Sequence, residues 1–213
     1  MRRIALALSL LAAQPLAAET FTLSLGSRAV GQMSLTSERL DIRVDESPLG
    51  VADGTFAASS RMVRMEDGRV VRQYLSDAPR KSRKISILHD AGTVIDTTVS
   101  PSSDATEMSA PAAVPQGVVD FVQGLNVITA ASACPGGMTL YEGRRLIRLD
   151  PTGSTSDGAT RTCDYSYRVT GGPGHLRPLS IRNATVQIAY TSGRLARITA
   201  SSGPFSVHVT PGG

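Results

Sequence analysis

Two cysteines carry the most definite chemistry in this sequence. Cys134 and Cys163 are the only ones, and they lie too far apart for the Cys-x-x-Cys spacing of a redox-active pair. A zinc site would need further ligands, and only three scattered histidines are present, His89, His175 and His208. An even number of cysteines favours a structural disulfide in an exported chain. We therefore predict a Cys134–Cys163 bridge, no metal site and no cofactor.

The common catalytic motifs are missing from the sequence. It has no Gly-x-Ser-x-Gly elbow, no Ser-x-x-Lys, no His-Glu-x-x-His and no phosphate-binding loop. His175 follows the segment Gly171-Gly172-Pro173-Gly174 and could be a general acid or base, although a single loop histidine is more often only solvated. We therefore expect a protein that is not an enzyme. A hydrolase with an unrecognised site is the weaker alternative, because the members of a triad come from distant positions.

The densest positive charge lies in one short segment, whose cations are Arg80, Lys81, Arg83 and Lys84. One interpretation is contact with anionic lipid head groups or with the phosphates of lipopolysaccharide. We favour the other, a solvated turn that leads into a strand at Ile85 and protects an exposed edge with its charge.

The N-terminal residues have the order of a secretory signal. Arg2 and Arg3 precede a small and apolar run from Ile4 to Ala13, and small residues precede Glu19. We predict that residues 1–18 are a cleaved signal peptide and that residues 19–213 form a single domain. The apolar run is much shorter than the ~20 residues of a bilayer span, so the mature protein should not span a membrane.

Removal of this segment also lowers the net charge. The whole chain has 22 Lys+Arg and 18 Asp+Glu, a net charge of +4, and the loss of two arginines leaves +2. A charge this small gives little support to nucleic-acid binding, which we do not expect.

Apolar and polar residues alternate along most of the mature chain, which is typical of half-buried strands. The clearest case is the run of Leu40, Ile42 and Val44, and Ile85 and Ile87 repeat the pattern. Glycine-containing turns separate about a dozen such segments. The pattern predicts a mainly β, antiparallel domain.

One segment has helical spacing instead. A helix over about residues 116–129 would place on one face the residues Val118, Phe121, Val122, Leu125 and Ile128. This apolar face would cover one face of the sheet. A later stretch, about residues 150–160, is of low complexity, and we predict that it is a surface loop.

Several segments together resemble the bacterial domain-of-unknown-function family 3108, which contains exported proteins of Gram-negative envelopes. These segments are Phe21–Gly31, Val114-Pro-Gln-Gly-Val-Val-Asp120, Leu140-Tyr-Glu-Gly-Arg-Arg145 after Cys134, and Cys163-Asp-Tyr-Ser-Tyr167. Phe121 stands where the family usually has proline. The resemblance implies a strongly curved, open, half-barrel-like antiparallel sheet with the helix on its concave face, similar to the periplasmic lipoprotein-carrier fold. It implies no catalytic residues.

We therefore expect a non-enzymatic protein of the Gram-negative periplasm that binds an amphiphile or a partner protein in envelope maintenance. The residues predicted to line its concave face, which would equally suit an ordinary core, are Leu40, Ile42, Val44, Ile85, Ile87, Phe121 and Leu125. The alternative is a scaffolding protein that binds its partner through an exposed strand edge.

Overall fold

The computed structural model describes residues 18–45, 54–175 and 180–212. The predicted signal peptide lies outside the described residues except for Ala18. No helix among the described residues is long and apolar enough to cross a membrane.

The described chain forms a single sheet of thirteen strands, in which all neighbouring strands are antiparallel. The strands are β1 (Glu19–Leu25), β2 (Arg28–Leu35), β3 (Arg39–Val44), β4 (Gly54–Arg64), β5 (Val70–Ala78), β6 (Arg83–Asp90), β7 (Thr93–Ser100), β8 (Met138–Tyr141), β9 (Leu146–Asp157), β10 (Thr160–Gly171), β11 (Asn183–Thr191), β12 (Arg194–Ser202) and β13 (Phe205–Pro211). The predicted fold class is confirmed.

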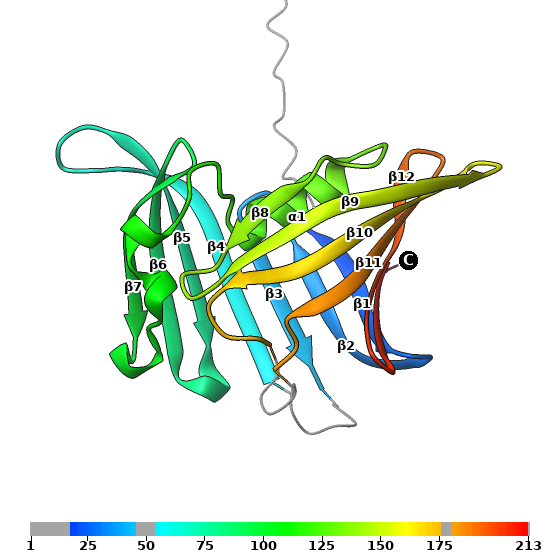
Figure 1. Cartoon of the computed structure of the whole chain (residues 1–213), viewed down its shortest axis with the longest axis horizontal. Coiled ribbons are helices and arrows are strands. Elements are labelled where there is room, and N and C mark those ends of the chain that lie inside the picture. Colours follow the sequence, from blue (N-terminus) through cyan, green and yellow to red (C-terminus); the bar gives the residue numbers. More distant parts are fainter. Residues whose placement is uncertain (1–17, 46–53, 176–179, 213) are drawn as a thin grey trace, which may run out of the picture.

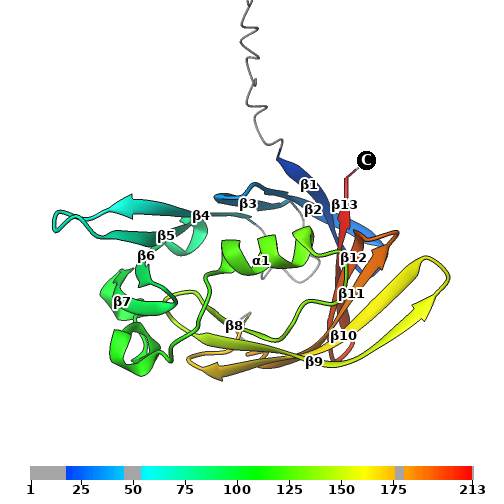
Figure 2. The same ribbon diagram turned by 90° about the horizontal axis from the view of Figure 1, so that it is seen from above.

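Two meanders make up the sheet, and the first and last strands join them. The strand order is β7-β6-β5-β4-β3-β2-β1-β13-β12-β11-β10-β9-β8. Every pair of adjacent strands is consecutive in sequence except β1 and β13, and the consecutive strands β7 and β8 lie at opposite ends of the sheet. There, Phe21 lies opposite Pro211 and Leu25 lies opposite Val207. The sheet bends strongly but does not close, because β7 and β8 remain its two ends (Figures 1 and 2).

The helix α1 (Phe121–Ala130) lies inside the bend of the sheet, as expected (Figure 2). It begins five residues later than the predicted start at residue 116. Asp120 is the N-cap and accepts a hydrogen bond from the backbone N–H of Gln123 at 2.9 Å. Val119 is extended and exchanges backbone hydrogen bonds with β8, so this part of the apolar pattern belongs to a strand-like pairing.

Three short 3-10 helices, η2 (Ser102–Asp104), η3 (Glu107–Ser109) and η4 (Pro111–Ala113), lie between β7 and α1. A fourth, η1 (Pro79–Lys81), connects β5 to β6.

The prediction of a loop over residues 150–160 is wrong. Strands β9 and β10 continue through this stretch as a two-stranded ribbon with register pairs up to Thr160 and Asp157, and only a tight turn at Gly158 separates them. The β9 residues from Pro151 to Asp157 are all exposed. Neither face of this part of β9 is buried, so the sequence lacks the apolar alternation by which strands are recognised.

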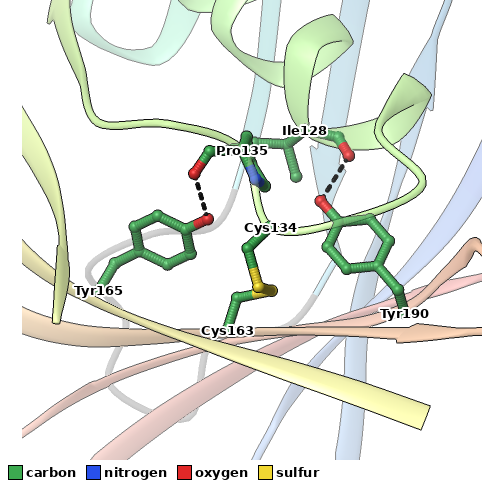
Figure 3. The surroundings of a disulfide bond; sticks show 6 residues. All are labelled: Ile128, Cys134, Pro135, Cys163, Tyr165 and Tyr190. Carbon is green, nitrogen blue, oxygen red and sulfur yellow. Dashed lines mark hydrogen bonds between the residues drawn. A yellow bond between two sulfur atoms is a disulfide. The ribbon is translucent and has the colours of Figure 1, made fainter. Parts of the chain in front are cut away.

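The predicted disulfide is present. Cys134 and Cys163 are bonded, with their Cα atoms 5.5 Å apart, and the bond fastens the segment after α1 to β10 (Figure 3). Two tyrosines on neighbouring strands bind the same region: Tyr165 donates to the carbonyl of Pro135 at 2.7 Å, and Tyr190 donates to that of Ile128 at 2.8 Å. The helix and its exit are therefore fixed to the β10–β11 half of the sheet.

Candidate functional site

Side chains on the concave face become more exposed along the strands with distance from α1. On β3, Leu40 is fully buried, whereas Ile42 and Val44 are partly exposed. On β4, Ser60 and Ala58 are buried, and Phe56 is partly exposed. The face is thus closed where the helix covers it and less covered farther away.

The other half of the sheet has the same gradient on β12 and β13 but not on β10. On β10, Tyr167 is partly exposed between the buried Tyr165 and Val169. On β12, Ile198 is buried and Ala200 is partly exposed. Val207 on β13 lies opposite Ala200 and is 40 % exposed.

We use the term open end for the partly exposed apolar residues that continue the buried core away from α1. They are Ile42, Val44, Phe56, Tyr167, Ala200 and Val209. All six pack against the buried core, so the open end and the core form one contiguous apolar surface.

The residues predicted to line the concave face all belong to this core or pack against it. Leu40, Ile85 and Ile87 are buried in it. Phe121 and Leu125 of α1 are partly exposed and pack against it from the helix side. Ile42 and Val44 are also partly exposed, and they belong to the open end.

A group of basic side chains lies beside the open end, and we call it the basic cluster: Lys81, Arg144, Arg145 and His175. Tyr167 connects the two, because its hydroxyl hydrogen-bonds His175 Nε2 at 2.5 Å. Arg145 Nη1 contacts the other ring nitrogen of His175. Arg145 Nε also lies 2.8 Å from Glu142 Oε1, in an ion pair without hydrogen-bond geometry.

Positive charge is crowded in the basic cluster. Burial, and then the nearby charges of Arg145 and Lys81, lower the pKa of His175 to about 3. Burial also lowers the pKa of Lys81, and Arg83, Arg145 and Arg144 lower it further. Glu142 is the acidic side chain within this group, and burial raises its pKa against the opposing effect of Arg145. The cluster is therefore a place where an added negative charge would be stabilised.

The four cations of the predicted basic segment face different surroundings. Arg80 and Lys81 belong to η1, and Lys81 contributes to the basic cluster. Arg83 pairs with Asp104 at 2.5 Å. Lys84 lies opposite Asp77 on the outer face of the sheet. The segment is thus divided among three environments.

A second polar group lies beneath the start of α1. Ser60 donates to Asp120 Oδ2 at 2.5 Å, and Arg72 Nη1 donates to Ser60 Oγ at 3.3 Å. The amide of Gln123 is satisfied when its nitrogen donates to Asp120 Oδ2 at 2.8 Å and its oxygen accepts from Arg72 Nε at 3.0 Å. Asp120 and Arg72 are therefore linked through Ser60 and Gln123.

Neither candidate histidine has the partners of a catalytic triad in the described part of the chain. His89 is 3 % exposed, and neither of its ring nitrogens has a hydrogen-bond partner there. His175 hydrogen-bonds Tyr167 and Arg145. The described residues also contain no group of three metal-binding side chains.

The basic cluster could not be predicted from the sequence. Its residues come from η1, the β8–β9 turn and the segment after β10, which only the folded sheet brings together. The one local signal is Glu142-Gly143-Arg144-Arg145, charged residues in a short turn between two apolar strands.

Comparison with known proteins does not identify the chain, since no family, curated protein or solved structure matches it.

Proposed function

We propose that this protein is a non-enzymatic protein of the bacterial periplasm that binds an anionic amphiphile in envelope maintenance. The single observation that carries the proposal is the contact between the open end and the basic cluster through Tyr167 and His175. Membership of the domain-of-unknown-function family 3108 and export through the N-terminal signal are parts of the same proposal. The disulfide supports export, because such bonds persist in oxidising compartments.

The open end suits the apolar part of an amphiphile. Ile42, Val44 and Phe56 continue the core without being fully buried. An acyl chain laid against them would remove apolar surface from water, which stabilises a complex by roughly 25 cal/mol per Å². The outer face of the same strands offers Arg43 and Thr55 instead.

The basic cluster suits the head group. Lys81, Arg144 and Arg145 outnumber the two carboxylates that act on them, Glu142 and Asp104. Arg144 and Arg145 are only 8 % exposed as whole residues. Charge-assisted hydrogen bonds from partly buried cations are stronger than those between neutral groups. A carboxylate or phosphate head group beside Tyr167 would reduce the mutual repulsion of these cations.

A fluorescent fatty acid, dansylundecanoic acid, can test the proposal with the purified mature protein. Val44→Asp places a charge at the open end and should weaken binding by about tenfold or more. Thr55→Asp is the matched control, because Thr55 lies on the next strand but on the outer face, and its affinity should equal that of the wild type. Equal affinities for both variants would contradict the proposal.

The head-group part has its own test. Lys81 is exposed, so Lys81→Met should fold normally. It should weaken binding of dansylundecanoic acid but leave the affinity for an uncharged alcohol of the same chain length unchanged. An equal loss for both probes would show that Lys81 does not contact the head group.

A scaffolding role is the second candidate, and one observation favours it. In the described chain, β7 ends the sheet and pairs on one side only, with β6. An edge of this kind can accept a strand from another protein. Pull-down after mild crosslinking distinguishes the two functions, because a scaffold should recover a stoichiometric protein partner and no lipid.

A further inference from the structure

A small cavity of about 260 Å³ lies between the start of α1, strand β5 and the β6–β7 turn. Its polar lining comes from Arg72, His89 and Gln123. Valines form much of the rest, and the exposed side chain of Met62 stands at its edge. The cavity is separate from the open end and the basic cluster.

His89 has hydrogen-bonding groups that no other described residue uses. Its side chain lines the cavity, only 3 % of the residue is exposed, and both ring nitrogens are buried without a partner among the described residues. Buried polar atoms in folded proteins nearly always have a hydrogen-bond partner. A neutral imidazole has one donor and one acceptor, so His89 can serve a ligand in either role.

Arg72 is held next to His89. The two residues are cross-strand neighbours on β5 and β6. Ser60 and Gln123 fix the guanidinium from the side of Asp120. Asp120 in turn accepts hydrogen bonds from the Ser60 hydroxyl and from the Gln123 backbone and amide nitrogens, so its carboxylate is satisfied without a ligand.

The charges around the cavity balance before anything binds. Arg72 is positive and Asp120 is negative, and they are the charged groups that act on His89. Burial lowers the pKa of His89, Asp120 opposes this shift and Arg72 adds to it, so the ring is neutral at neutral pH. An anion that entered would leave one unbalanced negative charge, and a proton on His89 would restore neutrality.

We propose that this cavity binds a small monocarboxylate with a short apolar tail, and that His89 takes up one proton as it binds. The carboxylate accepts hydrogen bonds from His89 and Arg72. The tail lies against Val70 and Val119, which line the cavity and keep exposed surface. Valine walls and a single compensating proton favour a monoanion of this kind over phosphate, which would bring more charge and need more donors.

Sodium butyrate and the purified mature protein provide the test. Calorimetric titration at neutral pH, in two buffers of different ionisation enthalpy, should show saturable binding with uptake of close to one proton. The ring carbon signals of one histidine should shift in NMR spectra and be missing in His89→Phe, which should bind no butyrate. The control His208→Asn, on β13, should bind as the wild type does. Absence of saturable binding, or binding without proton uptake, would overturn the proposal.

A second variant keeps the test decisive if His89→Phe does not fold. Met62 is 52 % exposed at the edge of the cavity, so Met62→Trp should fold and fill part of the space. Butyrate affinity should fall at least tenfold while His89 is retained. Unchanged affinity in Met62→Trp would place the carboxylate elsewhere.

Discussion

Asp120 shows how much one buried side chain can determine. It is fully buried, caps α1 and binds Ser60 on the concave face of β4. It therefore sets both the first residue of the helix and the place where the helix meets the sheet. Nothing local in the sequence shows that this residue is the cap or that its partner lies sixty positions earlier.

Replacing Asp120 should therefore destabilise the protein. Asp120→Ala removes the cap and leaves the Ser60 hydroxyl and Arg72 with fewer partners in a buried site. We expect the free energy of unfolding to fall by about 2–4 kcal/mol, measured by urea denaturation. Asp41→Ala is the control, because Asp41 is an exposed acidic residue on β3, and it should change the midpoint little. Similar midpoints for the two variants would argue against the role of Asp120.

His175 should make stability depend on pH. Its pKa is lowered to about 3 in the folded protein, whereas an unfolded histidine titrates near 6.5. Between these values the unfolded chain holds a proton that the folded protein does not, so the free energy of unfolding should fall as the pH is lowered. In His175→Asn this loss should be smaller, as urea midpoints at neutral and acidic pH would show. An identical loss in both proteins would contradict the assignment.

At the level of strands and helices, the sequence predicted those elements that have one buried face. The alternation in β3 and β6 indicated strands, and the structure has them. The β9–β10 ribbon was not predicted because both faces of its outer part are exposed. The helix was predicted to start too early because the apolar residues Val118 and Val119 fit a helix and a strand equally well. A hydrophobic pattern shows which residues are buried. It cannot identify a strand with no buried face, and it cannot separate a helix from a strand where consecutive residues are all apolar.

The disulfide joins two of these elements, and its removal should be measurable. It closes a loop between residues 29 apart in sequence, for which chain entropy predicts a contribution of ~3–4 kcal/mol. The variant with both Cys134→Ala and Cys163→Ala should unfold at a lower urea concentration than the oxidised wild type. Dithiothreitol should lower the wild-type midpoint and leave that of the double variant unchanged. A midpoint of the double variant equal to that of the oxidised protein would show that the bond contributes little.

For the molecule as a whole, the long-range pairing of β1 with β13 joins the two meanders. The sequence indicated many antiparallel strands, but nothing local shows that the first and last of them are neighbours. The basic cluster is equally non-local, since Lys81 and His175 meet only after the sheet has bent. Curvature was expected only from the family resemblance, and the bend observed here creates both the buried core and the open end.

The β1–β13 pairing leads to a prediction about truncation. A chain that ends at Ser202 lacks β13 and therefore loses the partner of both β1 and β12. We expect it to lose cooperative unfolding in circular dichroism, whereas a chain that ends at Pro211 should retain it. Cooperative unfolding of the shorter chain would mean that the two meanders are stable without this junction.

Native mass spectrometry of the protein purified from its own host tests amphiphile binding most directly. We predict a bound species whose mass corresponds to an anionic lipid or fatty acid, present in the wild type and in Thr55→Asp but lost in Val44→Asp. A wild-type protein that carries no lipid, together with a dry and filled interior in an experimental structure, would contradict the proposal.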